Sequence, residues 1–335
     1  MDQPIDFVIL WVDGEDKEWR HQRQRFQHTC AGEDDSEERY RDWGLLRYWF
    51  RGAEQFAPWV RKIHFVTCGH LPPWLNKKHP RLHIVKHEDY IPEEFLPTFS
   101  SHVIENHMHR IPGLAEHFVY FNDDMFILRP LRPSDFFKEG KPCDLLAFQP
   151  IVANPLSPVM PYIFLNNMSI LCKYFNKREN VRKHWKNYFC FTYPPLYFVY
   201  NLLELFFPLY TGLYTVHGPS PFCKETFRDV WAREEEVLTQ ISANRFRSKN
   251  DTSQYLFREW QKLSGNFHPQ NILKNLCYAE VQDDNARLIH AIETQKKKII
   301  CINDAPILKN PEAAQKELQM AFEKILPQPS AFEIE

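Results

Sequence analysis

The 335-residue sequence lacks the marks of several large classes of protein. Its formal net charge is only −2, so no overall electrostatic field attracts nucleic acid, and we expect no nucleic-acid partner. Its eight cysteines form no CxxC pair and no dense cluster, which indicates reduced thiols rather than a disulfide framework or a zinc site. Internal repeats and low-complexity tracts are absent as well. The remaining balance, 44% hydrophobic and 25% charged residues, is typical of a soluble globular protein.

Targeting and membrane-spanning patterns are also missing. The opening "MDQPIDFVILWVDGED" has no basic region before its short apolar run, unlike a signal peptide. The most apolar stretch, "PPLYFVYNLLELFFPLYTGLY", carries Glu204 and Pro208 near its middle. A carboxylate at the centre of a membrane span costs roughly 2.5–3.5 kcal/mol, and proline interrupts a helix. We therefore expect a cytoplasmic protein in which this stretch is a buried or interfacial element.

Four short runs rich in Ile, Val and Phe predict β-strands in the first half of the chain: "IDFVILWV", "KIHFVTC", "RLHIVKH" and "HFVYF". Apolar residues at helical spacing in "GLLRYWFRGAEQF" predict an amphipathic helix between the first two strands. This alternation favours an α/β fold with a mainly parallel, Rossmann-like or GT-A-like sheet. In such sheets ligands bind beyond the carboxyl ends of the strands. The acidic segments "VDGED" and "NDD" follow two of these strands, so we expect them to be neighbours in space.

The pattern divides the chain into three expected parts. Residues 1–141 hold the α/β core, and residues 142–214 form an insertion or lid rich in Pro, Tyr and Phe. Residues 215–335 return to the core with further helices, the last of which has Asn310 as its cap and Pro311 at its first position. Aromatic residues make up 15% of the chain, which indicates mainly packing in core and lid, although flat rings also make platforms for sugars.

The segment Asn122-Asp123-Asp124 directly follows the run "HFVYF". Hard cations such as Mg²⁺ prefer carboxylate oxygens and commonly use one or two of them together with substrate phosphates. An acidic pair at a strand end therefore suits a metal site for a diphosphate, with Asp123 and Asp124 as ligands. A turn with solvated carboxylates is the plainer alternative.

The stretch "TFSSHVIENHMHRIPGL" predicts a helix over residues 100–113, one face of which carries His102, Glu105 and His109. The spacing does not favour a single metal site, and a solvated polar face is the alternative. We favour a functional role only for Glu105, because this helix leads directly into the strand that carries the acidic pair.

Two later segments supply groups for proton and phosphate chemistry. His217 precedes a Gly-Pro turn in "YTVHGPSPF", and a histidine titrates near neutrality, which suits general acid or base catalysis. "NRFRSKNDTSQYLF" supplies Arg245, Arg247 and Lys249 for phosphate binding, and Asp251 as the N-cap of the following helix. An ordinary loop histidine and a solvated basic loop are the alternatives.

The order and length of these motifs resemble the Stealth family of sugar-phosphate transferases, which includes bacterial capsular polysaccharide phosphotransferases and the animal N-acetylglucosamine-1-phosphotransferase. The first family block is similar to "IDFVILWVDGEDKEW", and the second is similar to the stretch from "RYRDWGLLRYWF" to "HFVYFNDDMF". The third corresponds to "HGPSPFCKETFRDVW", followed by "RFRSKNDTSQYLFREWQ". The middle of the chain matches much less.

The resemblance implies roles for individual residues. Animal members often carry Asn where this chain has Asp13 and Trp43, which leaves the roles of those two positions open. Catalysis and phosphate handling fall on Glu105, Asp124, His217 and Arg247, and Asp123 shares the acidic motif. The substrate-binding positions that we expect are Asp13, Gly14, Asp16, Arg39, Arg41, Asp42, Asn122 and Asp251.

The implied reaction moves hexose 1-phosphate from a nucleotide sugar, with UDP as the expected carrier, to a hydroxyl of a glycan or lipid-linked glycan. Mg²⁺ or Mn²⁺ would be the cofactor, and either His217 or Glu105 would take the acceptor proton. A metal-dependent glycosyltransferase using the same donor is the main alternative; a phosphodiesterase and a glycan-binding protein are weaker ones. The apolar stretch, with the basic segments "KREN" and "RKHWK" nearby, would lie at the inner face of the bacterial plasma membrane, contact capsule assembly machinery, or line an acceptor entrance.

Overall fold

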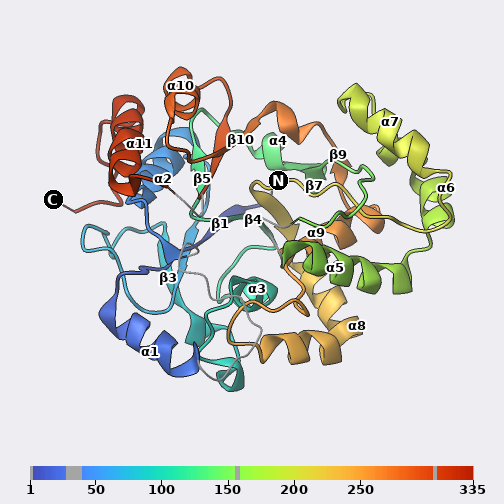
Figure 1. The fold of residues 1–335 in the computed structure, drawn as a ribbon, viewed down its shortest axis with the longest axis horizontal. Coiled ribbons are helices and arrows are strands. Elements are labelled where there is room, and N and C mark those ends of the chain that lie inside the picture. Colours follow the sequence, from blue (N-terminus) through green and yellow to red (C-terminus); the bar gives the residue numbers. More distant parts are fainter. Residues whose placement is uncertain (1–2, 28–39, 155–158, 305–307, 335) are drawn as a thin grey trace.

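Five strands form the central sheet of the computed structural model, which describes residues 3–27, 40–154, 159–304 and 308–334. They are β1 (Ile5–Leu10), β2 (Ile63–Thr67), β3 (Leu82–Lys86), β4 (His117–Phe121) and β8 (Ser220–Cys223). Their order in the sheet is β3-β2-β1-β4-β8 (Figure 1). β1 pairs in parallel with β2 and β4, β2 pairs in parallel with β3, and β8 runs antiparallel to β4. The four predicted strands and the mainly parallel sheet are confirmed.

Alternate residues of the central strands point to opposite faces of the sheet, and both faces are buried. In β1, Phe7 and Ile9 belong to one apolar cluster, whereas Val8 belongs to the other. In β4, Phe121 joins the first cluster and Tyr120 joins the second. Strands buried on both faces have nearly continuous apolar sequences. This explains why the four runs are recognisable from the sequence.

Two pairs of helices cover these faces. α2 (Leu46–Phe56) and α11 (Pro311–Ile325) supply Trp49 and Phe322 to the first cluster, at the left of Figure 1. α8 (Lys224–Ser242) and α9 (Gln254–Leu263) supply Phe227 and Phe257 to the second, with ring centroids 3.9 Å apart. The side chain of Asn310 accepts a hydrogen bond from Ala313 at the start of α11, as predicted.

The remaining elements surround this core. Helices α5–α7 fall within residues 142–214 and lie at the right of Figure 1; the three-part division of the chain itself stays a prediction. Two three-stranded sheets have the orders β10-β11-β5 and β6-β7-β9. The helices are α1 (Lys17–Gln27), α3 (Ser101–Asn106), α4 (Pro133–Phe136), α5 (Met160–Tyr174), α6 (Lys177–Tyr188), α7 (Pro195–Glu204) and α10 (Ala286–Thr294). The strands are β5 (Met125–Ile127), β6 (Phe137–Lys138), β7 (Lys141–Asp144), β9 (His268–Pro269), β10 (Leu276–Glu280) and β11 (Ile299–Asn303).

Two predictions about composition can be compared with this fold. The seven cysteines among the described residues are free thiols. Over the same residues, no helix combines the length and the apolar character that crossing a bilayer requires. In the most apolar stretch of the chain, only the first part forms a helix, α7, which has 10 residues.

Candidate active site

The candidate site lies where the carboxyl ends of β1 and β4 meet. Because these strands are parallel neighbours, the residues that follow them emerge at one edge of the sheet. β8 runs antiparallel to β4, with Ser220 opposite Tyr120, so the loop before β8 brings His217 to the same edge. The backbone N–H of Ile302 in β11 donates to the carbonyl of Asp124 at 2.8 Å. Segments far apart in the sequence therefore converge here.

Hydrogen bonds link Asp124, His217 and Tyr255. Nε2 of His217 lies 3.0 Å from Oδ2 of Asp124, and Nδ1 lies 3.1 Å from the hydroxyl of Tyr255. A carboxylate can only accept, so beside it Nε2 carries the proton of the neutral imidazole and Tyr255 donates to Nδ1. Burial raises the pKa of Tyr255, which keeps its hydroxyl protonated. The side chains of His217 and Asp124 are 31% and 23% exposed, so both remain accessible to a ligand.

Negative charge accumulates around Asp123, next to Asp124 in the turn between β4 and β5. The Asp123 side chain is exposed at the surface, but many protein atoms lie around it and weaken its solvation. This desolvation, together with the charges of Asp124 and Asp42, raises the pKa of Asp123 to about 7. Desolvation also raises the pKa of Asp42, and the charge of Asp13 adds to this effect. The prediction that the acidic segments after β1 and β4 are neighbours is confirmed.

Glu105 is buried behind this edge, where protein groups occupy both of its carboxylate oxygens. Oε1 accepts from the hydroxyl of Tyr120 at 3.1 Å, and Oε2 accepts from the backbone N–H of Gln254 at 3.1 Å. Gln254 is the first residue of α9, so the carboxylate lies at the positive end of the helix dipole. Glu105 thus connects α3 and β4 to the helix that carries Tyr255.

The helix predicted over residues 100–113 ends at Asn106, the last residue of α3. The carbonyl of Asn106 accepts a hydrogen bond from the indole of Trp231 at 2.8 Å instead of continuing the helix. His109 follows in a 3₁₀ turn. The prediction that it shares one helical face with His102 and Glu105 is therefore wrong.

The basic loop before α9 directs Arg247 toward the site. Arg247 donates to the hydroxyl of Ser101 at 2.7 Å, and its positive charge acts on Asp123. Arg245 instead donates to the carbonyl of Pro97 at 2.8 Å. Arg247 therefore acts on the acidic edge, by which we mean Asp13, Asp42, Asp123 and Asp124, whereas Arg245 has a structural role.

Asp251 is fully buried and holds this loop together. Its carboxylate accepts from the backbone N–H of Ser248 at 2.9 Å and from the amide of Asn244 at 2.7 Å, and it lies 2.9 Å from Nδ1 of His102. Ser253 occupies the N-cap position of α9, so the prediction of Asp251 as that N-cap is wrong. The donors within the loop and on α3 draw the carboxylate away from the helix end.

Of the predicted residues in the segment after β1, Asp13 lies beside a recess that is described below. Gly14 and Asp16 have structural roles instead. A Cβ on Gly14 would lie 1.9 Å from the carbonyl oxygen of Tyr40, so only glycine lets the two segments pack this closely. Asp16 accepts from the backbone N–H of Trp19 at 2.7 Å and caps the start of α1.

The other predicted binding residues lie around the same edge, except Arg39, which lies outside the described residues. Arg41 donates to Asp304 at 3.0 Å, just beyond the end of β11. Asn122 is half-buried in the turn between β4 and β5. Asp42 lines the recess described next.

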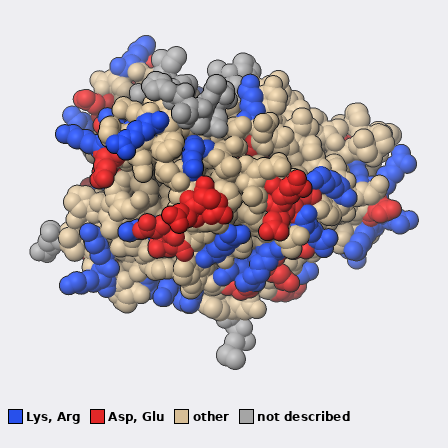
Figure 2. All heavy atoms as spheres, turned by 90° about the horizontal axis from the view of Figure 1, so that it is seen from below, with Lys and Arg blue, Asp and Glu red and all other residues tan. Residues whose placement is uncertain are grey.

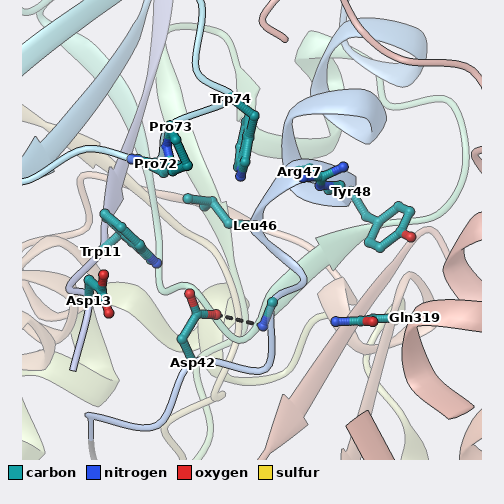
Figure 3. A pocket seen from close by; sticks show the side chains of 11 residues that line it. Trp11, Asp13, Asp42, Leu46, Arg47, Tyr48, Pro72, Pro73, Trp74 and Gln319 are labelled. Atoms are coloured by element: carbon teal, nitrogen blue, oxygen red, sulfur yellow. Dashed lines mark hydrogen bonds between the residues drawn. The ribbon is translucent and has the colours of Figure 1, made fainter. Parts of the chain in front are cut away.

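A recess of about 400 Å³ opens beside Asp13 and Asp42 (Figure 3). Its walls come from the end of β1, the start of α2, the segment after β2, and α11. Trp11 and Trp74 supply flat apolar faces, and Arg47 adds a positive charge. The acidic edge thus continues into a surface that suits a ring-shaped ligand.

Known proteins match the chain over its full length. Family models for Stealth proteins match at conserved region 1, residues 3–28, and at conserved region 2, residues 39–144. The capsular polysaccharide phosphotransferase WcwK of Streptococcus pneumoniae is 40% identical over 335 residues, which cover 99% of this chain and 98% of that protein. The chain belongs to the Stealth family. His217 and Arg247 lie beyond the two segments that the family models match.

Two further Stealth relatives show the same extent of similarity. The receptor polysaccharide phosphotransferase WefC of Streptococcus gordonii is 36% identical over 338 residues and covers 100% of both chains. The exopolysaccharide phosphotransferase cps2G of Lactiplantibacillus plantarum is 36% identical over 98% of this chain and 96% of that protein. The whole described fold therefore corresponds to proteins named as phosphotransferases.

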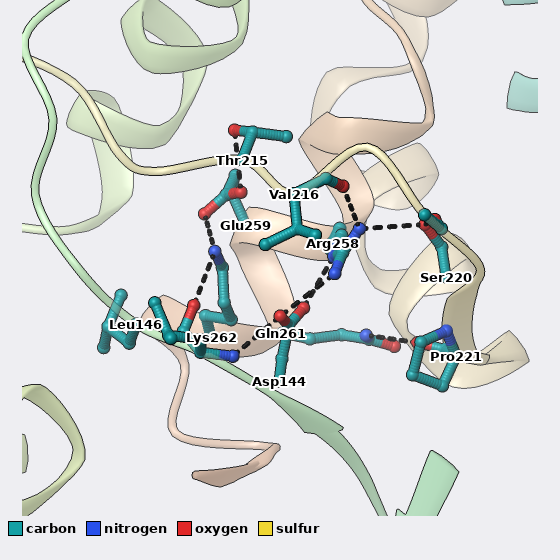
Figure 4. Close-up of polar contacts among 12 residues, drawn as sticks. Asp144, Leu146, Thr215, Val216, Ser220, Pro221, Arg258, Glu259, Gln261 and Lys262 are labelled. Carbon is teal, nitrogen blue, oxygen red and sulfur yellow. Dashed lines mark hydrogen bonds and ion pairs between the residues drawn. The ribbon is translucent and has the colours of Figure 1, made fainter. Parts of the chain in front are cut away.

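In this Stealth protein, every residue of α9 is buried, including several charged ones. Figure 4 shows the polar contacts of three of these, Arg258, Glu259 and Lys262. Arg258 donates to both carboxylate oxygens of Asp144, at 2.6 and 3.0 Å. It also donates to the carbonyl of Val216 at 2.8 Å, directly before His217. The buried charges of α9 therefore fix the loop that carries the histidine.

Sequence analysis missed this role of α9. The sequence "QYLFREWQKL" does indicate buried charges, because Arg258, Glu259 and Lys262 stand among large apolar residues. Lys262 and Glu259 form an ion pair at 2.7 Å within the helix. Arg258, however, needs Asp144, which is 114 positions away in the sequence. No local pattern identifies such a partner.

The site of this Stealth protein fits a divalent cation at Asp123 and Asp124. Oδ1 of Asp124 is buried without a hydrogen-bond partner, although Oδ2 is bonded to His217. A buried carboxylate oxygen without a partner is costly, and a cation would satisfy it. Within the described ranges, no three His, Cys, Asp or Glu side chains form a complete metal site. Mg²⁺ commonly combines one or two protein carboxylates with substrate phosphates, so Asp123 and Asp124 are of the ligand type that it uses.

Proposed function

We propose that this protein transfers hexose 1-phosphate from a nucleotide sugar, with UDP as carrier, to a glycan hydroxyl and so forms a phosphodiester. The family supports the coarser statement, that the protein is a capsular or exopolysaccharide phosphotransferase. The observation that carries the finer proposal is the His217–Asp124 pair, with Asp123 and Arg247 beside it. A base, paired carboxylates and a guanidinium are the groups that phosphoryl transfer uses.

In this proposal, His217 is the general base. The Tyr255 hydroxyl can donate to Nδ1 or accept from it, so it supports both neutral tautomers of the imidazole. When an acceptor hydroxyl takes the place of Asp124 beside Nε2, the imidazole can carry its proton on Nδ1, and the lone pair of Nε2 can then take the proton of that hydroxyl. The acceptor oxygen then attacks the sugar-bearing phosphorus, the bond between the two phosphates breaks, and a nucleoside monophosphate leaves.

Glu105 is less suited to be that base, because Tyr120 and the N-terminus of α9 already occupy its carboxylate. We propose instead that it is a positioning residue. By holding the start of α9, Glu105 keeps Tyr255 in place, and Tyr255 orients His217.

Arg247, and a cation held by Asp123 and Asp124, would stabilise the negative charge of the transferred phosphoryl group. A guanidinium can donate two parallel hydrogen bonds to phosphate oxygens, and Arg247 lies close enough to act electrostatically on Asp123. Asp123 and Asp124 would hold Mg²⁺ or Mn²⁺, which supplies positive charge to the diphosphate when bound. Positioning and electrostatics of this kind dominate phosphoryl transfer.

The recess beside Asp13 and Asp42 would hold the ring-shaped part of the donor. It adjoins the acidic edge, and the faces of Trp11 and Trp74 can pack against a base or a sugar ring. A lipid-linked glycan would be the acceptor, which would place the enzyme at the inner face of the plasma membrane. The names of the relatives, which are capsular and exopolysaccharide phosphotransferases, support a glycan as the acceptor.

Phosphorus NMR of the glycan product tests the proposed function. After incubation with candidate nucleotide sugars, Mg²⁺ and acceptor, the product should show a phosphodiester resonance. Asp124→Asn, which removes one charged ligand and the partner of His217, should reduce product formation roughly 100-fold while leaving the fold intact. A glycan product without phosphorus would identify the alternative, a glycosyltransferase.

A further inference from the structure

Helix α7 has its polar side buried and its apolar side exposed. Asn201 is completely buried and Glu204 is 5% exposed, although both are polar. Leucine, valine and phenylalanine side chains of α7 and the turn after it point outward instead. The exposed residues include Leu196 (53%), Val199 (52%), Leu202 (58%), Leu203 (55%), Phe206 (84%) and Leu209 (72%).

Hydrogen bonds fix α7 in this orientation. The Asn201 side chain accepts from the backbone N–H of Phe148 at 2.7 Å and donates to the carbonyl of Tyr188 at 2.6 Å. The buried ammonium of Lys177 donates to the carbonyl of Glu204 at 2.7 Å and to two carbonyls in the following turn. Rotating the helix to bury its leucines would break these bonds and leave buried polar groups unsatisfied. The exposure of the apolar side is therefore built into the fold.

Basic residues lie beside this apolar surface. Helix α6 exposes Arg178, Arg182, Lys183 and Lys186, together with Trp185, which is 54% exposed. In Figure 2 the right-hand end of the molecule, where α6 and α7 lie in Figure 1, is mostly tan and blue with little red. Apolar side chains flanked by an exposed tryptophan and basic residues are typical of protein surfaces that bind the interface of a bilayer.

We propose that the α7 patch (Leu196, Val199, Leu202, Leu203, Phe206 and Leu209) inserts into the surface of an anionic lipid bilayer, with the basic side chains of α6 at the headgroups. The positive charge of α6 favours anionic lipid over a second copy of this chain, because a second copy would bring like charges together. The proposal deepens the proposed function, since a lipid-linked acceptor would lie in the same bilayer. The interaction itself requires neither donor nor catalysis.

Vesicle sedimentation without substrates tests the proposal. Wild-type protein should bind phosphatidylcholine vesicles that contain phosphatidylglycerol, and binding should weaken as salt screens the charges. Leu203→Ser/Phe206→Ser should bind at least about tenfold more weakly, because two exposed apolar side chains no longer enter the lipid. Met320→Ser is the matched control, because Met320 is 72% exposed on α11, a helix that lies far from α7 in Figure 1. It should bind like wild type.

A charge variant separates the electrostatic part. Arg182→Gln/Lys183→Gln should weaken binding at low salt and converge with wild type at high salt. Equal melting temperatures of all variants would exclude misfolding, since every substituted side chain is exposed. Indifference of the wild type to anionic vesicles would overturn the proposal. So would a concentration-dependent dimer that Leu203→Ser/Phe206→Ser abolishes in the absence of vesicle binding.

The two proposals fail separately. A protein that binds vesicles through the α7 patch but forms no phosphodiester would refute the proposed function and leave the membrane surface standing. A protein that forms the phosphodiester on a soluble acceptor but ignores vesicles would do the reverse.

Discussion

His217 shows how neighbouring residues set the chemistry of a single side chain. Alone, an imidazole can carry its proton on either nitrogen. Here Asp124 lies at Nε2 and Tyr255 at Nδ1, so each nitrogen has one defined partner. Tyr255 is buried, and its hydroxyl stays protonated because burial raises its pKa. It can therefore hold the imidazole in place without competing for a proton near neutral pH.

Removing the Tyr255 hydroxyl tests this arrangement. Tyr255→Phe keeps the buried ring but leaves Nδ1 without its partner. We expect kcat to fall about tenfold or more, with KM for the donor little changed and a displaced pH profile of kcat. Tyr278→Phe is the control, because the Tyr278 ring lies 5.9 Å from that of His217 while its hydroxyl bonds Glu280. Equal losses in both variants, or an unmoved pH profile for Tyr255→Phe, would contradict the role given to the hydroxyl.

The pKa of Asp123 predicts a pH-dependent stability. Desolvation and the nearby carboxylates raise this pKa from 3.8 to about 7, so the folded protein binds the proton more tightly than the unfolded chain does. Its contribution to stability is therefore lost as the pH rises from about 4 to about 7. In the presence of chelator, Asp123→Asn should melt at a higher temperature than wild type at pH values above about 7, and the gain should vanish near pH 4.

Calorimetry across this pH range measures the effect, and cations provide an independent readout. Mg²⁺ or Mn²⁺ should raise the melting temperature of the wild type but not that of Asp123→Asn, because a bound ligand stabilises only the form that binds it. If Asp123→Asn raises the melting temperature equally at every pH, then desolvation and the neighbouring charges do not raise the pKa of Asp123.

Among the elements, α9 links the core to the site. Its apolar residues pack against α8, and its charged residues bind the loop before β8. The Arg258–Asp144 pair is almost completely buried, with 1% and 4% of the side chains exposed. Breaking such a pair leaves an uncompensated charge in a region of low dielectric constant.

Asp144→Asn should therefore lower the free energy of unfolding by about 3–5 kcal/mol, measured by urea denaturation. Replacing both partners, as Asp144→Leu/Arg258→Met, should recover much of that loss. Arg228→Gln is the exposed control. Arg228 pairs with Glu116 at 3.1 Å, but both side chains are largely solvated, so the cost should be about 0–1 kcal/mol. A small effect of Asp144→Asn would mean that water reaches the pair.

Local sequence patterns predicted the elements better than the contacts between them. The four core strands and the helix after Asn310 follow from apolar runs and a capping residue, because both depend on neighbours in the sequence. The early end of α3 depends on Trp231, and the role of Asp251 depends on donors from its own loop and from α3. Such tertiary partners lie outside any local window. The acidic edge was predictable because parallel strands bring their ends together.

At the scale of the whole molecule, three regions of the chain are needed to complete the site. The core strands bring the acidic residues, the loop before β8 brings His217, and the loop before α9 brings Arg247. The middle helices α5–α7 do not supply any of these groups, and α7 exposes apolar residues instead. This arrangement separates phosphate chemistry from the surface that we assign to the membrane.

The fate of the sugar-proximal phosphorus of the donor tests the central claim most directly. A donor labelled at that phosphorus is incubated with protein, Mg²⁺ and glycan acceptor, and the products are separated. If His217, Arg247 and the acidic pair direct attack at phosphorus, the label enters the glycan and the unlabelled nucleoside monophosphate is released. Recovery of the label as nucleoside diphosphate, with none in the glycan, would show attack at the anomeric carbon and would contradict the account.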